Sequence, residues 1–533
     1  MTMSSPDRCA SVSRRSSRIP RMSTPPFQRI GVVGSGAMGR GIAQLFVQSG
    51  IAVRLHDSNA AAVASAIAGI AEVFARQVEK GRMSADAAAA ARARLEPADA
   101  LTALADCDLV VEAIIERLDA KRELFGQLEA IVADDAVLAT NTSSLSVTAI
   151  AAACRRPQRV AGLHFFNPVP LMKVVEVIDG ARTDPAVLGR LAALVRLTGH
   201  LAVVAQDTPG FIVNHAGRGF GTEALKALGE GVADIATIDR ILREQVDFDG
   251  QGFRLGPFEL FDLTGLDVSQ PVMESIYRQF YDEPRFRPSV IAAQRLAAGL
   301  TGRKAGEGFY RYAEGRQQLA HEAAAPTVAV RPPVWVAPGP HAAMLREAVA
   351  ALQGVVHDTA EPGEHALVLV APLGLDASAA AAAAGLPAAR TVAIDTLFPI
   401  APGRCRRRVL MPTPATRADY RDAAHALFAT DGTPVSMLRD SPGFVAQRVL
   451  AMIVSIATEI AQQRIASPAG IDSAVRTGLG YPLGPLAMGD ALGATTVLEI
   501  LGNLHRLTGD PRYRPGGWLR RRAELGLSLL HED

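Results

Sequence analysis

Cysteine, aromatic residues and net charge are all scarce in this sequence. Its 533 residues include 4 cysteines, none of them in a Cys-x-x-Cys pair, and only 5% aromatic residues. The scattered cysteines argue against a disulfide scaffold and against a cysteine-type zinc site, so we predict no metal. Lys and Arg number 55 and Asp and Glu 54, which leaves a net charge of +1. This balance offers no electrostatic attraction to nucleic acid or to an anionic membrane, and we expect neither as a partner.

Long apolar runs are missing as well. The most apolar stretch, 366–389, is interrupted by prolines, glycines and an aspartate, whereas a membrane span needs about 18 consecutive apolar residues. The slightly positive mean hydropathy follows from the many alanines. Hydrophobic residues make up 49% and charged residues 20% of the chain, a composition typical of globular proteins. We therefore expect a soluble, cytoplasmic protein with several domains.

The first 21 residues differ from the rest of the chain. They contain five arginines, six serines and a single acidic residue. Organellar transit peptides have this composition, so import into an organelle stays open. A disordered tail, or a true start of translation at Met22, explains the same segment. We favour these simpler explanations and predict a disordered tail over 1–26, because the pattern of a folded chain begins abruptly at Phe27.

Short apolar runs alternate with longer amphipathic stretches from 28 to 206. This alternation predicts a mostly parallel, doubly wound sheet with helices on its faces. The expected strands cover 30–33, 51–55, 108–113, 136–140, 159–163 and 173–178. After the segment Asp207-Thr-Pro-Gly-Phe211 the pattern becomes helical. We therefore predict an α/β domain over 27–206 and an all-helical domain over 207–313.

A glycine motif lies where the first strand meets the first helix. Gly34-x-Gly36-x-x-Gly39 is followed by Asp57, which ends the second strand 18 residues after Gly39. This context is typical of a Rossmann domain, in which the helix N-terminus faces a pyrophosphate and the acid faces the adenosine ribose. A glycine-rich structural turn is the alternative. We predict NAD rather than NADP, because Asp57 would repel a 2′-phosphate. The expected cofactor contacts of this segment are Gly34, Gly36, Ala37, Met38, Gly39 and Asp57.

Further polar residues are expected at the carboxyl edge of the same sheet. Glu112 and Glu116, with Lys121 nearby, follow a predicted strand and either meet the nicotinamide ribose or form a solvated helix start. We assign Glu116 and Lys121 to the cofactor and leave Glu112 open. In Asn141-Thr-Ser-Ser144, helix capping explains Ser144 best.

A histidine and a glutamate are the candidates for the chemistry. His164 ends a predicted strand, and Glu176 lies 12 residues later inside an apolar run. A carboxylate within an apolar strand is costly unless it is paired, so we expect the two side chains to meet. Such a pair beside a nicotinamide suits hydride transfer from an alcohol, because the imidazole can take the hydroxyl proton.

These segments together resemble one enzyme family. The glycine motif, Asn141–Ser144, Gly162–Pro168, Val175–Val177 and Asp207–Asn214 are similar to segments of the L-3-hydroxyacyl-CoA dehydrogenases over about residues 28–312. The resemblance implies NAD-dependent oxidation of a (3S)-3-hydroxyacyl-CoA to the 3-oxoacyl-CoA. It also implies that His164 is the base and Glu176 its partner, that Ser143 and Asn214 bind substrate oxygens, and that Asp57 binds the adenosine ribose.

Two departures from the family pattern concern the acyl pocket. Asn214 is followed by His215, where the family usually has arginine, and Arg254 stands where the family often has proline. Arg254 is either a solvated surface arginine or a residue that recognises a carboxylate at the far end of the substrate.

The second half of the chain repeats parts of the first. Asp207–Asn214 reappears as Asp440–Gln447, and Gly256–Asp262 reappears as Gly484–Asp490. We therefore predict a degenerate repeat of the Rossmann and helical domains. It comprises a linker over 314–332, a reduced Rossmann-like domain over 333–415 and a second helical domain over 416–533. This long form resembles the bacterial subgroup that includes 3-hydroxyadipyl-CoA and 3-hydroxybutyryl-CoA dehydrogenases of fatty-acid and phenylacetate-type catabolism.

The repeated half has no recognisable catalytic group. His164, Glu176 and Asn214 align with Asp395, Val409 and Gln447, and the strand at 333–336 is followed by Ala337-Pro-Gly-Pro340 in place of a glycine motif. We expect one active site per chain. Family members with one helical domain pair it with that of a second subunit, so we predict that the two helical domains pair within this chain. The alternative is that the second half is a separate appendage and that the first helical domains dimerise between chains. A further homo-oligomer also stays open.

Two other functions stay open. One is a non-catalytic, NAD-binding structural protein, against which the complete set of His164, Glu176, Ser143 and Asn214 argues. The other is a dehydrogenase for another class of hydroxyacid, against which the segments Asn141–Ser144 and Gly162–Pro168 argue.

Overall fold

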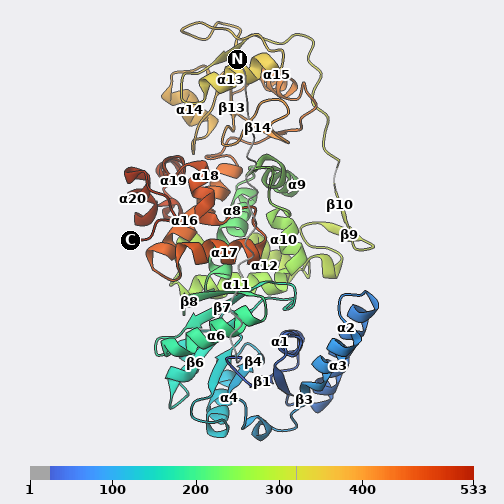
Figure 1. Ribbon diagram of the computed structural model, residues 1–533. Helices are drawn as coiled ribbons and strands as arrows, with labels where there is room; N and C mark the ends of the chain where they lie inside the picture. Colours follow the sequence, from blue (N-terminus) through green and yellow to red (C-terminus); the bar gives the residue numbers. More distant parts are fainter. Residues whose placement is uncertain (1–24, 320) are drawn as a thin grey trace, which may run out of the picture.

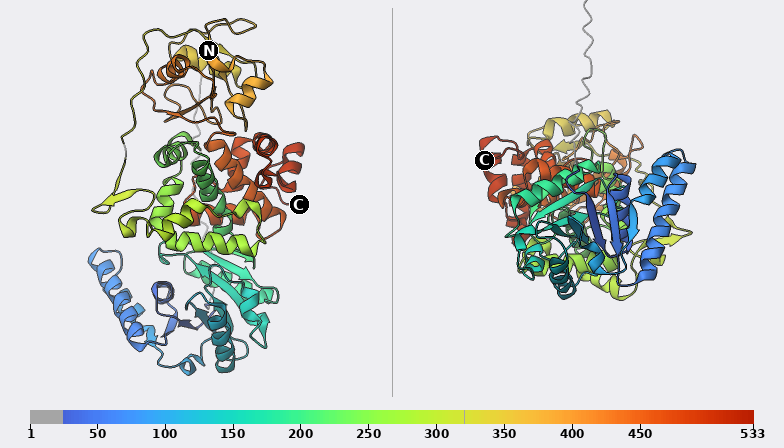
Figure 2. Two further views of the ribbon diagram at one scale, coloured as in Figure 1. Left: turned by 180° about the vertical axis from the view of Figure 1, so that it is seen from behind. Right: turned by 60° about the horizontal axis from the view of Figure 1, so that its bottom comes forward.

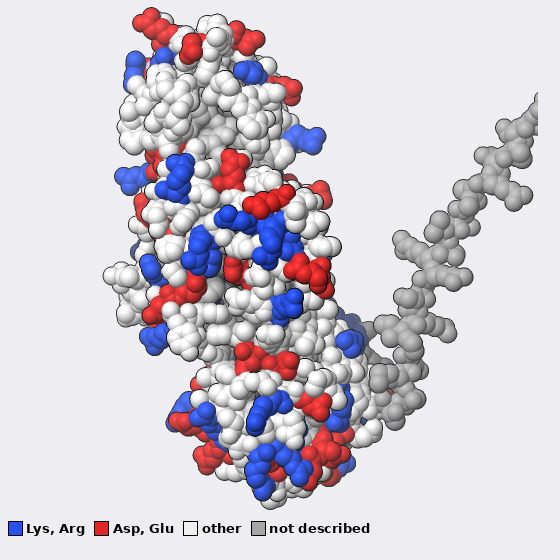
Figure 3. All heavy atoms as spheres, turned by 90° about the vertical axis from the view of Figure 1, so that its left-hand side faces the viewer, with Lys and Arg blue, Asp and Glu red and all other residues white. Residues whose placement is uncertain are grey.

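The computed structural model describes residues 25–319 and 321–533. The predicted tail over 1–26 lies outside the described residues except for its last two. Figure 1 shows an elongated molecule with a large α/β domain at one end, two helical domains beside each other in the middle and a smaller α/β domain at the other end. On the face drawn in Figure 3, acidic and basic side chains are intermixed along the whole length, in keeping with the balanced charge.

The first domain contains an eight-stranded sheet in the order β3-β2-β1-β4-β5-β6-β7-β8. Its central strands are buried on both faces, as in a sheet covered by helices. The strands are β1 (Arg29–Val33), β2 (Ala52–His56), β3 (Leu95–Pro97), β4 (Leu109–Glu112), β5 (Val137–Thr140), β6 (Val160–Phe165), β7 (Val174–Asp179) and β8 (Leu201–Gln206). The helices over the faces include α1 (Ala37–Gln48), α4 (Leu118–Ile131), α5 (Val147–Ala151) and α6 (Pro185–Leu197).

One pair of neighbouring strands in this sheet is antiparallel. β6 and β7 run in opposite directions, whereas the other neighbouring strands of the sheet are parallel. The connection over 166–173 is too short for the crossover that a parallel pair requires. This reversal places His164 directly opposite Glu176 in the register of the sheet.

A helical hairpin extends from the edge of the sheet that carries β2 and β3. It consists of α2 (Ala60–Glu79) and α3 (Ala85–Ala93). Among the described residues, α2 is the one helix that could cross a membrane by length and hydropathy alone. Its Val63, Ile70 and Phe74 are buried and belong to the same apolar core as β1 and β2.

The middle of the molecule is formed by the two helical domains. The first contains α7 (Val213–Ala216), α8 (Arg218–Gly229), α9 (Ile235–Arg240), α10 (Pro257–Thr264), α11 (Leu266–Gln279) and α12 (Val290–Ala297). The second contains α16 (Ala446–Gln462), α17 (Pro468–Leu479), α18 (Pro485–Leu492), α19 (Ala494–Thr508) and α20 (Gly517–Leu525). Both share one apolar core, and α8 approaches α16 so closely that a Cβ at Gly219 would lie 3.0 Å from the backbone of Ile453. The helical domains therefore pair within the chain.

The segment predicted as a linker is partly structured. β9 (Arg311–Ala313) and β10 (Arg316–Gln318) form an antiparallel hairpin, so extended structure continues into the predicted linker over 314–332. The chain then runs along the outside of the molecule to the smaller α/β domain (Figure 2, left). Glu322 in this segment accepts a hydrogen bond of 2.9 Å from the buried Arg407, which ties the segment to that domain.

The smaller α/β domain has a five-stranded sheet in sequential order. Its elements include β11 (Val334–Val336), α13 (Ala342–Ala351), β12 (Leu367–Val370), α14 (Ala377–Ala383), β13 (Thr391–Ile394), β14 (Arg408–Pro412) and β15 (Val435–Met437). Only the β13–β14 pair is antiparallel within this sheet. This is the pattern of β4 to β8 in the first domain. The smaller sheet therefore matches β4 to β8 in strand order and in strand direction.

The predicted boundary between 415 and 416 is wrong. Helix α15 (Ala418–Phe428) packs against β13 and β14, and β15 extends the sheet by pairing with β14. The smaller α/β domain therefore continues past Met437, and the second helical domain begins after Asp440. The repeat itself contained this information, since Gln206, the last residue of the first α/β domain, corresponds to Arg439 when Asp207 is aligned with Asp440.

Candidate active site

His164 and Glu176 meet between β6 and β7. His164 Nδ1 lies 2.6 Å from Glu176 Oε2, and the two side chains belong to residues that are 4% and 0% exposed. The other carboxylate oxygen, Oε1, accepts hydrogen bonds from the backbone N–H groups of Ile212 (3.0 Å) and Val213 (2.8 Å). An ionised carboxylate only accepts hydrogen bonds, so we assign the proton to Nδ1. His164 Nε2 then keeps a lone pair with which it can accept a proton.

The surroundings of His164 hold its ring in place. Phe166 and Phe211 lie with their ring centres 4.4 Å and 5.6 Å from that of the imidazole. Asn141 Oδ1 accepts a hydrogen bond of 2.8 Å from the backbone of Phe165, which connects the loop after β5 to the end of β6. The segment Asn141–Ser144 is thereby fixed beside the histidine.

Glu116 organises that loop. Its Oε1 accepts hydrogen bonds from the Thr142 hydroxyl at 2.7 Å and from the backbone N–H groups of Ser143 at 2.9 Å and Ser144 at 3.1 Å. Burial opposes ionisation of Glu116, but Lys121 and the Thr142 hydroxyl outweigh it and hold the pKa of Glu116 below its usual value. The prediction that Ser144 caps a helix is wrong: Ser146 is the N-cap of α5, and its hydroxyl accepts from the backbone of Ala149.

Glu112 and Lys121 form a buried ion pair. Lys121 Nζ lies 2.6 Å from Glu112 Oε1 and 3.2 Å from Glu116 Oε2, and Lys121 is 1% exposed. Glu112 also accepts a hydrogen bond of 2.7 Å from the Thr140 hydroxyl. Glu112 was expected either to meet the nicotinamide ribose or to form a solvated helix start, and it does neither. Its carboxylate is buried inside the domain. Lys121 lies behind Glu116 and supports it from inside the domain.

The glycine motif has the geometry of a dinucleotide cradle. Gly34 has φ +104°, and a Cβ there would lie 2.4 Å from the Ala113 carbonyl oxygen. A Cβ at Gly39 would lie 1.8 Å from the Gly34 carbonyl oxygen. Gly36 differs, because a Cβ there would contact nothing within 4 Å. The fold itself requires the first and third glycines. The second leaves open space at the N-terminus of α1, where N–H groups can bind phosphate.

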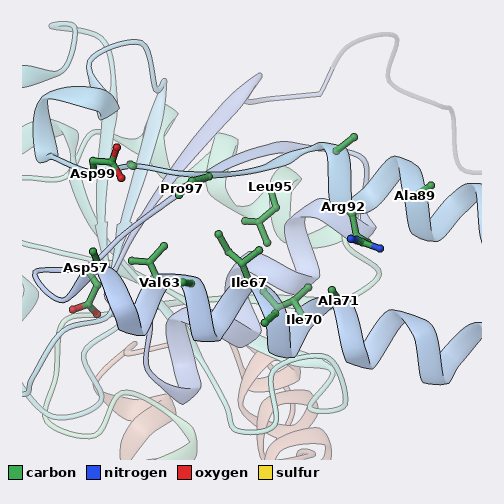
Figure 4. Close-up of a pocket in the computed structure, with 15 residues that line it drawn as sticks. Asp57, Val63, Ile67, Ile70, Ala71, Ala89, Arg92, Leu95, Pro97 and Asp99 are labelled. Atoms are coloured by element: carbon green, nitrogen blue, oxygen red, sulfur yellow. The ribbon is translucent and has the colours of Figure 1, made fainter.

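Asp57 lies next to this cradle. Its carboxylate accepts hydrogen bonds from the Ser35 backbone (2.8 Å), the Ser35 hydroxyl (2.9 Å) and the Asn59 backbone (3.0 Å). Burial opposes ionisation, but these donors, the Asn59 N–H first among them, lower the pKa of Asp57 overall. A cavity of about 880 Å³ extends from Asp57 between α2 and α3 and has mostly apolar walls (Figure 4). Neither His164 nor Glu176 lines it, so it is separate from the catalytic pair.

Asn214 lies on the other side of the catalytic pair. It directly follows Val213, whose N–H binds Glu176, and it lines a separate cavity of about 170 Å³ in the helical domain. Arg218 and Tyr481 line the same cavity, although neither belongs to a motif that indicates a site in the sequence. The available signal was an arginine one helical turn after Asn214. Arg254 is exposed and does not line this cavity.

The corresponding place in the second half holds different groups. Asp395, at the position of His164, is buried and accepts a hydrogen bond of 2.9 Å from the Gln447 amide. Burial raises the pKa of Asp395. Val409 replaces Glu176. The hydrogen bond between Asp395 and Gln447 thus lies where the first half has its histidine and glutamate.

Comparison with protein-family models identifies the family. The model described as 3-hydroxyacyl-CoA dehydrogenase, NAD binding domain, matches residues 29–208. The model for the C-terminal domain of the same dehydrogenase matches twice, at 210–312 and 443–528. The chain belongs to the 3-hydroxyacyl-CoA dehydrogenase family. Its helical domain therefore occurs in two copies, as the repeat in the sequence indicates.

Members of this family resemble the chain over different lengths. The 3-hydroxyadipyl-CoA dehydrogenase of Escherichia coli K12 is 37% identical over 511 residues, covering 93% of this chain and 98% of the relative. The human mitochondrial hydroxyacyl-coenzyme A dehydrogenase is 37% identical but covers 54% of this chain and 91% of its own length. A crystal structure of an Escherichia coli 3-hydroxybutyryl-CoA dehydrogenase matches with a TM-score of 0.79 and 36% identity, covering 94% of this chain and 98% of that one. The two-half organisation is thus shared with full-length relatives.

Proposed function

We propose that this protein oxidises a (3S)-3-hydroxyacyl-CoA to the 3-oxoacyl-CoA with NAD. The observation that carries the proposal is the 2.6 Å contact between His164 Nδ1 and Glu176, which leaves Nε2 free beside a dinucleotide cradle. Membership of the 3-hydroxyacyl-CoA dehydrogenase family supports the same reaction.

Each side chain of the active site has its own role in this reaction. His164 Nε2 takes the proton of the C3 hydroxyl, the C=O bond forms, and the C3–H bond breaks with its electron pair. Bound NAD supplies the acceptor for that hydride. Glu176 stabilises the imidazolium and keeps its orientation through two backbone N–H groups of the α7 start. Ser143 and Asn214 hold the substrate oxygens, and the same groups serve the reverse reaction.

The residues present fit an NAD molecule. Open space at Gly36 and the N-terminus of α1 suit the pyrophosphate, and the ionised Asp57 suits an unphosphorylated adenosine ribose. Glu116 faces the segment Asn141–Ser144 and would lie at the nicotinamide ribose. The carboxylate of Asp57 disfavours NADP, since like charges in contact cost several kcal/mol.

We infer that the second half is a reduced copy of the first. Asp207 accepts hydrogen bonds from the start of α5, and Asp440, its counterpart in the repeat, does the same for α14. Phe211 and Phe444 share the unusual φ of +49°. The match between β11–β15 and β4–β8 supports the same interpretation. The copy has lost the cradle and the catalytic pair, so each chain has one active site.

Initial rates test the proposed function. The purified protein is assayed with 3-hydroxybutyryl-, 3-hydroxyhexanoyl- and 3-hydroxyadipyl-CoA, each with NAD and with NADP. We expect NAD reduction with at least one substrate and a clear preference over NADP. Tight NAD binding without turnover of any substrate would instead support a structural role for the protein.

A further inference from the structure

The 170 Å³ cavity beside Asn214 has mostly apolar walls and a few polar side chains. It lies between α8, α10 and α11 and is closed by the last residue of α17, Leu479, and by Tyr481 just after it. Phe220, Phe261 and Met273 are among its apolar walls. Pockets that enclose whole drug-sized ligands measure about 300–1,000 Å³, so this one suits only one end of a ligand. The hydroxyls of its Thr222, Thr264 and Ser269 have hydrogen-bond partners within the fold, whereas Arg218 and Tyr481 differ from them.

Arg218 is a cation without a counter-charge. Its Nε donates a hydrogen bond of 2.8 Å to the Asn214 carbonyl oxygen. In the part of the chain that the structure describes, no carboxylate forms an ion pair with its guanidinium. Burial lowers the pKa of Arg218 to about 10, which leaves it charged at neutral pH. A partly buried guanidinium without an anion is unfavourable, so the cavity favours an anionic ligand.

Tyr481 adds a hydroxyl with no partner. The residue is 4% exposed, and its hydroxyl forms no hydrogen bond with any described residue. An unpaired buried polar group is unfavourable, and a bound acceptor would relieve that cost. The ring is fixed by Phe253, whose centre lies 5.1 Å away in an edge-to-face arrangement. When Gly256 is aligned with Gly484, Phe253 of the first half corresponds to Tyr481 of the second half. Phe253 lacks a hydroxyl, so only the second half places one at this position.

We propose that Arg218 and Tyr481 bind the terminal carboxylate of a 3-hydroxy dicarboxylic acyl-CoA. This inference rests on the proposed function and names the substrate class of that site. Arg218 follows Asn214 by one helical turn, about 6 Å along the axis. In a six-carbon diacid the carboxylate carbon lies three carbon–carbon bonds beyond C3, a comparable span. The guanidinium then forms a charge-assisted pair, and the tyrosine donates to a carboxylate oxygen.

This proposal gives the second half a role in the active site. Leu479 and Tyr481 come from the repeated half and close a cavity whose other walls belong to the first helical domain. A purely apolar acyl tail would leave the Arg218 guanidinium without an anion and the Tyr481 hydroxyl without a hydrogen-bond partner. Arg254, which is exposed, provides a matched arginine outside the cavity.

The test compares two substrates of equal carbon number. 3-Hydroxyadipyl-CoA and 3-hydroxyhexanoyl-CoA differ at C6, which is a carboxylate in one and a methyl group in the other. We expect R218Q to shift the ratio of their kcat/KM values about 10–100-fold towards hexanoyl, because hydrogen bonds to charged groups contribute about 1.5–3 kcal/mol. Y481F should shift the ratio about 2–10-fold in the same direction. R254Q should leave the ratio unchanged. Equal losses on both substrates in R218Q and Y481F would overturn the proposal.

A binding measurement separates this inference from the proposed function. Adipyl-CoA and hexanoyl-CoA lack the 3-hydroxyl and are not oxidised, so calorimetry reports their affinities directly. The wild-type protein should prefer adipyl-CoA, and R218Q and Y481F should reduce that preference. If the wild-type protein oxidises no substrate but keeps the preference, the proposed function fails and the carboxylate site stands. If it oxidises hexanoyl substrates and shows no preference, this inference fails alone. Y481F, which keeps the ring, decides the matter should R218Q fold poorly.

Discussion

Arg448 and Glu223 form a buried ion pair across the interface between the two helical domains. Arg448 Nε donates to Glu223 Oε1 at 2.8 Å, and the two residues are 2% and 0% exposed. Arg512 reaches Oε2 at 3.1 Å, and the Tyr513 hydroxyl donates to Oε1 at 2.6 Å. One carboxylate from the first helical domain thus accepts from three residues of the second.

The repeat places different residues at the symmetry-related positions. Ile456 corresponds to Glu223, His215 to Arg448, and Phe286 to Tyr513. His215 packs against Phe286 with ring centres 5.0 Å apart. One of the two symmetry-related sites in the interface therefore contains the carboxylate, the arginine and the tyrosine hydroxyl. The other site contains none of these three groups. Fusion of the two halves in one chain allows such an asymmetry, which identical subunits cannot have.

Glu223→Ala should strongly destabilise the protein. The substitution removes the anion that the buried Arg448 and Arg512 share and leaves Arg448 with Glu230 as its one remaining ion-pair partner among the described residues. Breaking a buried ion pair in this way costs about 3–5 kcal/mol. Thermal and urea unfolding should both show the loss. Asp267→Ala provides the control, since its pair with Lys304 is exposed and worth about 0–1 kcal/mol. Similar effects of the two substitutions would contradict the importance of the buried pair.

His164→Gln should lower kcat by a factor of at least about 10²–10⁴, the usual contribution of a general base. NAD affinity, measured by fluorescence titration, should stay close to that of the wild type. His200→Gln is a matched control, because His200 is also buried in this domain and binds the Val169 carbonyl oxygen. Near-normal turnover in His164→Gln would exclude His164 as the base.

Glu176→Gln should reduce both kcat and stability. A glutamine has one acceptor oxygen, so it cannot accept from the histidine and from Ile212 and Val213 as the carboxylate does. One buried donor then loses its partner, at about 1–3 kcal/mol, and kcat should fall at least about 100-fold. Glu129→Gln is the control, since Glu129 also accepts from two backbone N–H groups but supports the chain at Arg155 and Arg156. It should lower the melting temperature and leave kcat intact.

The architecture of the first domain was accessible from the sequence because its signals are local. Strand and helix periods, the glycine spacing and the carboxylate in the apolar run around Glu176 each have a physical reason within a few residues. The antiparallel β6–β7 pair is less visible, although the short connection over 166–173 excludes a parallel crossover. Recognition of the repeat also predicted which groups the second half lacks.

The remaining features depend on contacts between distant residues. The sequence favours neither of two roles for Glu112, because it does not show that Lys121 turns inwards to meet it. The position of Arg254 in a motif suggests that it recognises a carboxylate, whereas the arginine that lines the cavity is Arg218. Tyr481 was missed because it enters the cavity from the other half of the chain.

Asp57→Asn should raise the NADP/NAD ratio of kcat/KM by about 100-fold. The amide removes the negative charge that faces a 2′-phosphate, and contact between like charges costs several kcal/mol. NAD affinity should also fall, because Asp57 holds Ser35 and Asn59 in place. Asp86→Asn, at the exposed start of α3, controls for net charge and should leave the ratio unchanged. A wild-type protein that prefers NADP would refute this role of Asp57.

His215 should make the fold sensitive to acid. The residue is 1% exposed, and burial, assisted by the positive charge of Arg218, lowers its pKa to about 3. In the unfolded chain a histidine has a pKa of about 6.5. Between these values the unfolded state binds a proton that the folded state does not, so stability falls as the pH falls from about 6.5 towards 3.

His215→Met removes this titration while filling a similar space with an adaptable apolar side chain. At pH 5 the unfolded histidine gains about 1.5 pH units of protonation free energy, or about 2 kcal/mol, and at pH 7.5 it gains almost nothing. The unfolding free energy of the variant relative to the wild type should therefore rise by about 2 kcal/mol between pH 7.5 and pH 5. His321→Gln, at an exposed position, should show no such change. Calorimetric melting of the three proteins at both pH values measures the difference, and an equal offset at the two values would mean that His215 titrates alike in the folded and unfolded chain.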